Sequence, residues 1–147
     1  MTTRFHGHLL RRGRHSQPGQ IYLVTTVTAH RQAVFDDLPQ GRCVVRTLRE
    51  LDLAGAARTL AFVVMPDHLH WLLALGEAMT LGRVVRLAKG RAARRINTLR
   101  REFGQPPLAP LWQAGYHDRA LRSEDDLRAR PLRGRQSAAG RAGAAAG

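Results

Sequence analysis

Two strand-length apolar runs separated only by Pro66 and Asp67 constrain the fold of this chain more than any other feature. The first run covers residues 59–65 and the second residues 68–75. Proline removes a backbone donor, and aspartate readily bonds its own backbone, so the pair favours a turn. We therefore predict a β-hairpin, which places an antiparallel pair at the centre of the fold.

The flanking segments supply further elements. Residues 20–28 are rich in β-branched residues and follow the turn signal Pro18-Gly19, which predicts a strand. After Pro39, apolar side chains recur at helical spacing until Gly55, which predicts a helix. A second helix is expected at residues 81–99, because one apolar face runs through it.

A loop with three prolines, residues 105–110, precedes the last predicted strand. Leu111-Trp112 and Tyr116 to Leu121 indicate this short strand. The order strand, helix, strand, strand, helix, strand is typical of an α+β ferredoxin-like sandwich, with helices on one face of an antiparallel sheet.

Composition divides the chain into three parts. Residues 1–19 mix arginine, histidine and glycine without a clear period, which indicates a basic N-terminal arm. Residues 20–128 form one domain, and a helix is expected to begin near Ser123. Residues 129–147 offer no large apolar side chain beyond Leu132, so we expect a disordered tail.

The charge balance favours a polyanionic partner. Lysine and arginine number 24 against 11 acidic residues, a formal net charge of +13. Lys89 is the sole lysine, and arginine can grip phosphate with two hydrogen bonds as well as stack on bases. Solubility, a ribosomal role or a membrane-surface role would also explain the charge. No apolar run approaches a membrane span, so we expect a cytoplasmic, nucleoid-associated protein without a membrane partner.

Basic residues crowd the second predicted helix outside its apolar face. They are Arg83, Arg86, Lys89, Arg91, Arg94, Arg95, Arg100 and Arg101. Glu102 is their one acidic neighbour, which is too little for salt-bridge lacing, so we expect contacts to a DNA backbone. The alternative is an ordinary solvated face. Trp112 could stack on an unpaired base or pack in the core, and the sequence leaves both open.

The segment Met65-Pro66-Asp67-His68-Leu69-His70-Trp71 carries the clearest chemical signal. Side chains alternate along a strand, so His68 and His70 point to one face and Leu69 to the other. Two imidazoles aimed together can hold one divalent metal ion. With seven histidines in the chain, a chance pair is the alternative.

This segment resembles the HUH motif of tyrosine transposases, especially the branch associated with repetitive extragenic palindromes. The similarity extends to residues 22–28, to Lys89-Gly90 and to residues 111–122, and it covers roughly residues 18–128. It implies that His68 and His70 ligate Mg²⁺ or Mn²⁺ while a tyrosine attacks a phosphate of single-stranded or hairpin DNA. No nucleotide cofactor is implied, and the protein would act as a monomer or a homodimer.

The chain departs from that pattern where the nucleophile belongs. The resemblance implies a C-terminal helix with Tyr-x-x-x-Asn-Pro, but Pro131-Leu132-Arg133-Gly134 stands there, so no catalytic residue is assigned. A back-translation of residues 131–144 read one base later restores this motif, which suggests a frameshift near Arg130. We therefore expect a DNA-hairpin transposase that is inactive as written.

Two alternatives remain. The chain could be a non-catalytic module that binds DNA hairpins, which the missing tyrosine favours directly. A basic protein that binds RNA or the ribosome would explain the charge but not the His-x-His segment.

Overall fold

The computed structural model describes residues 17–121. The predictions for most of the basic arm, for the helix near Ser123, for the end of the domain at residue 128 and for the tail therefore lie outside the described residues.

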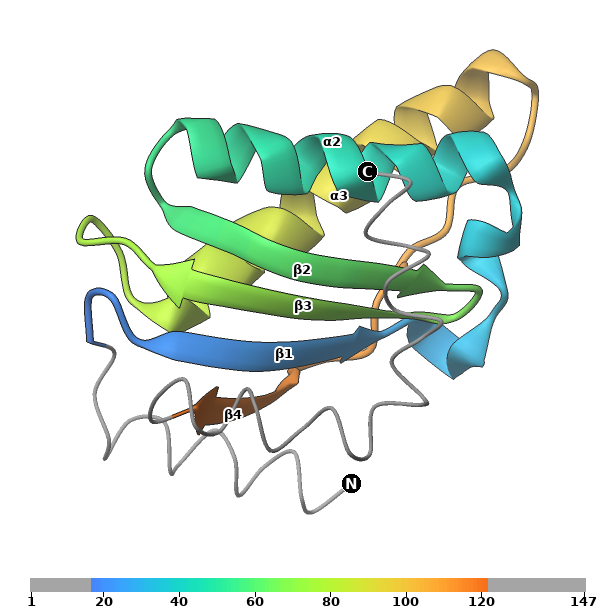
Figure 1. The fold of residues 1–147 in the computed structure, drawn as a ribbon. Helices are drawn as coiled ribbons and strands as arrows, with labels where there is room; N and C mark the ends of the chain where they lie inside the picture. The colour runs from blue at the N-terminus through green and yellow to red at the C-terminus, as the bar shows by residue number, and fades with distance from the viewer. Residues whose placement is uncertain (1–16, 122–147) are drawn as a thin grey trace.

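Four antiparallel strands form one sheet, with two helices on one of its faces (Figure 1). The strands are β1 (Ile21–Val27), β2 (Ala57–Met65), β3 (His68–Leu75) and β4 (His117–Leu121). The helices are α2 (Leu38–Leu53) and α3 (Leu81–Glu102). The sheet order is β2-β3-β1-β4, so the two central strands are separated in sequence by α2 and β2. This arrangement confirms the predicted ferredoxin-like fold.

Alternation along the two central strands creates the core. Val24 on β1 and Trp71 and Leu73 on β3 are at most 1% exposed and point toward the helices. Val84 and Ile96 of α3 belong to the same core cluster and are fully buried. The indole N–H of Trp71 would be costly to bury unpaired, and it donates to Thr59 Oγ1 at 3.0 Å.

Both helices begin at capping residues. Asp37 caps α2 and accepts from the backbone N–H of Gln40, and Thr80 caps α3 and accepts from that of Arg83. After α2 the chain turns at Gly55, whose φ of 79° suits glycine. No helix within residues 17–121 is long and apolar enough to cross a membrane.

The connections differ in part from the prediction. The final strand begins at His117 rather than at Tyr116, and Trp112 makes only an isolated bridge to Thr28. Gly115, with a φ of 80°, turns the chain between these two pairings and interrupts the strand. Two short 3₁₀ helices, η1 (Ala29–Arg31) and η2 (Val34–Asp36), connect β1 to α2 and were not predicted.

Candidate metal centre

His68 and His70 lie on the face of the sheet that the helices leave open. They alternate along β3 with Leu69 and Trp71, which are buried beneath the helices. His68 is opposite Val27 in the β1 register. The predicted orientation of the two imidazoles is therefore what the structure shows.

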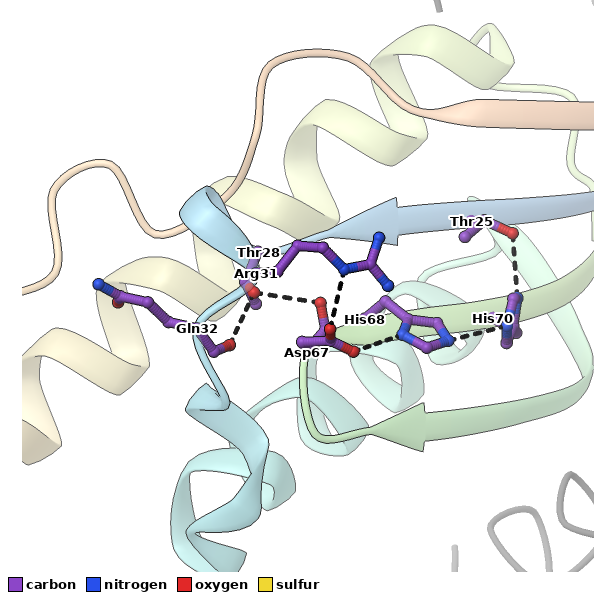
Figure 2. A network of polar contacts seen from close by, with 7 residues as sticks. All are labelled: Thr25, Thr28, Arg31, Gln32, Asp67, His68 and His70. Atoms are coloured by element: carbon purple, nitrogen blue, oxygen red, sulfur yellow. Dashed lines mark hydrogen bonds and ion pairs between the residues drawn. The ribbon is translucent and has the colours of Figure 1, made fainter. Parts of the chain in front are cut away.

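The two rings meet through their Nε2 atoms, which are 3.1 Å apart. Each Nδ1 atom is held by another residue (Figure 2). His68 Nδ1 lies 2.7 Å from Asp67 Oδ1, and His70 Nδ1 lies 3.0 Å from Thr25 Oγ1 on β1. The imidazoles are thus fixed in direction by a carboxylate on one side and a hydroxyl on the other.

These partners decide where the ring protons can sit. An ionised carboxylate only accepts, so His68 carries its proton on Nδ1 and its Nε2 presents a lone pair. The Thr25 hydroxyl can accept as well as donate, so His70 can also hold its proton on Nδ1. With both protons on Nδ1, the two Nε2 lone pairs would face one cation. Without a cation the 3.1 Å contact is a hydrogen bond, in which His70 Nε2–H donates to His68 Nε2 and the Thr25 hydroxyl donates to His70 Nδ1.

The spacing of the two nitrogens fits an octahedral ion. Cis ligands with bonds of about 2.1 Å, as for Mg²⁺, lie about 3 Å apart, and the observed Nε2 separation is 3.1 Å. Within residues 17–121 no group of three His, Cys, Asp or Glu side chains could hold a metal ion. The two imidazoles therefore form a partial ligand set.

The electrostatics favour the neutral form of His70. Burial lowers the pKa of His70, and the charge of protonated His68 lowers it further. The hydrogen bond from His68 keeps the pKa of Asp67 below its usual value, with Arg31 adding to the effect. A neutral imidazole beside an ionised carboxylate is the combination that a histidine ligand of a metal requires.

Thr28 ties the Asp67 turn to the end of β1. Its backbone N–H donates to the Asp67 carbonyl at 2.9 Å, and its hydroxyl lies 3.1 Å from the same oxygen and 2.8 Å from the carbonyl of Gln32. Thr28 is fully buried. The Asp67 carbonyl is therefore held at the end of β1, which fixes the backbone that carries the carboxylate beside His68.

The basic face of α3 lies in the helical layer, away from the imidazoles. Arg83, Arg86 and Arg94 are exposed there, and Arg91 is half-buried. The structure therefore does not bring the predicted metal ligands and the predicted phosphate-binding arginines together on one surface. DNA that contacts both would have to pass around an edge of the sheet.

Three of the basic residues predicted to contact DNA, Lys89, Arg95 and Arg100, have partners elsewhere in the fold. Arg100 donates to Gln40 Oε1 at 3.0 Å and to the Pro106 carbonyl at 2.7 Å. Arg95 donates to Thr47 Oγ1 at 2.9 Å and pairs with Glu50, both on α2. Lys89 Nζ donates to the backbone carbonyls of Gln113 and Gly115 at 2.8 and 2.7 Å. These side chains hold α3 to its neighbours.

Trp112 is part of the core. The residue is 8% exposed, and its ring lies 5.5 Å, centroid to centroid, from that of Phe35. Its indole N–H donates to the Lys89 carbonyl at 3.0 Å. Of the two roles left open by the sequence, packing is the one that the structure displays, and stacking on a base would require the ring to leave these contacts.

Neither tyrosine of the chain reaches the histidine pair. Tyr22 is 6% exposed and Tyr116 is 8% exposed, and both belong to the core beneath the helices. Tyr22 and Thr25 are three positions apart on β1, so their side chains point to opposite faces of the sheet. Thr25 is paired with His70 and shares its face, so Tyr22 points away from His70. Both tyrosines are therefore core residues of this fold.

Sequence reasoning assigned no role at the histidine pair to Thr25, Arg31 or Asp67. Asp67 adjoins His68 in the sequence, and that adjacency was a signal for a carboxylate that orients the ring. Thr25 and Arg31 are distant in sequence and are brought to the centre only by the pairing of β1 with β3.

The fold and the site together define an α+β protein with an aligned His-x-His pair on the open face of its sheet. The sequence model of a protein family described as "Transposase IS200 like" matches residues 16–125. The chain therefore belongs to the IS200-like transposases, as the resemblance implied. A comparison with curated proteins gives no match.

Two solved structures share the fold. One is a tyrosine transposase associated with repetitive extragenic palindromes (REP), bound to a REP hairpin, with 18% identity and a TM-score of 0.58 over 80% of this chain and 70% of that one. The other is a Deinococcus radiodurans R1 protein assigned as a transposase, with 23% identity and a TM-score of 0.56 over 79% of this chain and 89% of that one.

Proposed function

We propose that this protein binds single-stranded or hairpin DNA and presents one phosphate to a Mg²⁺ or Mn²⁺ ion held by His68 and His70. The observation that carries the proposal is the pair of Nε2 atoms 3.1 Å apart on the open face, each ring fixed through its Nδ1 atom. The hairpin bound to one of the similar structures supports hairpin DNA as the ligand class. No nucleotide cofactor enters the proposal.

The chemistry is transfer of a DNA phosphoryl group. A bound divalent cation would stabilise charge that develops on the phosphate as an oxygen nucleophile attacks. The protein's own contribution is preorganisation, because Asp67 and Thr25 hold the imidazoles in direction before any ligand arrives. Exposed arginines of α3, namely Arg83, Arg86 and Arg94, would contact the DNA backbone elsewhere on the molecule.

The nucleophile is the missing part. The sequence has two tyrosines, Tyr22 and Tyr116, and both are buried away from the imidazoles. We therefore propose that the chain as written binds DNA without cleaving it, which is the non-catalytic alternative. A protein with the reading frame changed near Arg130 would regain the tyrosine helix and would cut and rejoin DNA through a 5′-phosphotyrosine.

The test compares the two forms on a labelled hairpin with a single-stranded extension, with Mg²⁺ or Mn²⁺. The frame-changed protein should form a covalent DNA adduct that survives denaturation, and the chain as written should only shift the hairpin in a gel. The adduct should disappear when the restored tyrosine is replaced by phenylalanine or when His68 and His70 are changed to alanine. A failure of both forms to bind DNA would refute the proposal.

A further inference from the structure

The turn that leaves β1 is strained beside the histidine pair. His30 and Arg31 have φ values of 56° and 52°, which places two consecutive residues with side chains in the left-handed region. This region favours glycine, because a Cβ atom crowds the following carbonyl there. Strain of this kind persists only where the surrounding structure holds it, and it concentrates at functional sites.

Backbone hydrogen bonds hold the turn in place. Ala29 N–H donates to the Leu111 carbonyl at 2.9 Å, Arg31 N–H to Thr28 at 3.1 Å, and Gln32 N–H to Ala29 at 3.2 Å. The buried Thr28 hydroxyl closes the turn onto the Gln32 carbonyl. The conformation of Arg31 is therefore set by two other parts of the fold, the end of β1 and the segment at Leu111.

The result is a guanidinium beside the metal centre. Arg31 Nε donates to Asp67 Oδ2 at 3.1 Å, and the other oxygen of the same carboxylate accepts from His68 (Figure 2). The Arg31 side chain is 61% exposed. Among the described residues, its two terminal nitrogens have no hydrogen-bond partner, and so they are available to a ligand.

An ion pair alone is a weak reason for this arrangement. Exposed pairs of arginine and carboxylate contribute little to stability, so the Arg31–Asp67 contact does not explain two strained residues. A guanidinium anchored through Nε presents its two terminal N–H groups as a fork, the geometry that binds phosphate oxygens with two hydrogen bonds. Asp67, which accepts from Arg31, also accepts from His68, so the fork lies beside one of the proposed metal ligands.

We propose that Arg31 is the phosphate-binding residue of the open face. Its terminal nitrogens hold the same DNA phosphate that reaches His68 and His70, and Asp67 orients the guanidinium and the His68 ring together. This inference rests on the proposed function. It places a guanidinium beside the imidazoles, which the α3 arginines, in the opposite layer, do not provide. Arg58 of β2 and Arg119 of β4 lie opposite open-face residues nearer the other end of the strands.

The test measures binding of the full chain to fluorescein-labelled hairpin DNA with a mixed-sequence single-stranded extension, by anisotropy with Mn²⁺. The variants are Arg31→Ala, Arg31→Lys and Arg31→Gly. Arg49→Ala is the matched control, because Arg49 is exposed on α2 and carries the same charge. Arg31→Gly guards against misfolding, since glycine accepts the positive φ and should leave the protein at least as stable in urea.

Arg31→Ala and Arg31→Gly should weaken binding about tenfold and reduce the salt slope by about one, because one phosphate contact is lost. Arg31→Lys should recover only part of the affinity, since lysine lacks the fork. Arg49→Ala should change affinity less than about twofold. A neutral methylphosphonate can then replace one phosphate at a time along the extension. At one position this replacement should weaken DNA binding by the wild type and leave DNA binding by Arg31→Ala unchanged.

Two results would overturn the inference, and they are distinguishable. If the wild type binds DNA and the Arg31 variants bind as Arg49→Ala does, Arg31 does not hold the phosphate and the proposed function stands. If the wild type fails to bind DNA, the proposed function fails and the inference fails with it.

Discussion

Asp67 should control the metal affinity of the centre without being a ligand. Its Oδ1 fixes the His68 ring from 2.7 Å and keeps the proton on Nδ1. Asp67→Ala removes this acceptor, so His68 can rotate and can place its proton on Nε2, the atom that must be free. Asp67→Asn keeps an oxygen acceptor but loses the charge, which weakens the hydrogen bond to His68.

The size of the effect follows from the role. Removing the partner that orients a histidine ligand weakens metal binding about 10- to 100-fold, or about 1.4 to 2.7 kcal/mol. We expect Asp67→Asn near the lower end, because the contact to His68 survives in neutral form. Asp67→Ala should lie near the upper end, because the Thr25 contact still holds His70 while nothing holds His68.

The assay is titration of the full chain with Mn²⁺, with the free ion followed by its electron paramagnetic resonance signal. Asp36→Asn is the control, because Asp36 is exposed and the substitution removes the same charge. Thermal melting in the absence of metal checks that each variant folds. If Asp67→Ala binds Mn²⁺ as tightly as the wild type while His68→Ala does not bind it, the orienting role is wrong.

Three further predictions follow from the structure. The pKa of His70 is below its ordinary 6.5 in the folded protein, so as the pH falls below about 6.5 the unfolded chain takes up a proton first and the free energy of unfolding falls. Urea unfolding of the metal-free protein at pH 7.5 and 5.5 should therefore show a larger loss of unfolding free energy for the wild type than for His70→Gln. Equal losses would contradict the shift. Thr28→Val removes a buried hydroxyl whose single proton bonds either the Gln32 or the Asp67 carbonyl. Both carbonyls keep a backbone N–H donor, so the loss should be that of one hydrogen bond, about 0.5–1.5 kcal/mol of unfolding free energy. Unfolding in denaturant beside the exposed control Thr98→Val measures it, and a cost equal to that of the control would count against the anchoring role. Arg94→Ala should weaken DNA binding and lower the salt slope of binding by about one, with little change in stability, because Arg94 is exposed. Arg95→Ala should lower stability and leave the salt slope unchanged, because Arg95 is paired with residues of α2. The reverse pattern would show that the paired arginine is the one that contacts DNA.

The helix–strand order and the faces of the strands were predictable from local sequence patterns. The hairpin at Pro66-Asp67 and both helices occur where the apolar periodicity placed them. The shared direction of His68 and His70 follows from the period of two along a strand, which backbone geometry alone imposes. The family resemblance was carried by the same local segments, and the family match confirms it.

Residues 111–121, the last part of the chain that the structure describes, show where sequence patterns misled about boundaries. Leu111-Trp112 and Tyr116 suggested strand, but Trp112 makes only a single bridge, to Thr28. Gly115 separates that bridge from β4. A short apolar run does not by itself distinguish a paired strand from a buried connection.

The sequence by itself determined which residues alternate, where helices begin, and that two imidazoles share a face, because each depends on neighbours within a few positions. Only the tertiary structure decided that Thr25 and Arg31 join Asp67 at the histidine pair, since the β1–β3 register brings them together. It also decided that Lys89 and Arg95 bind other parts of the protein. A charged side chain carries no local mark of whether its partner is solvent, DNA or a distant carbonyl, so its role is settled only by what the fold places beside it.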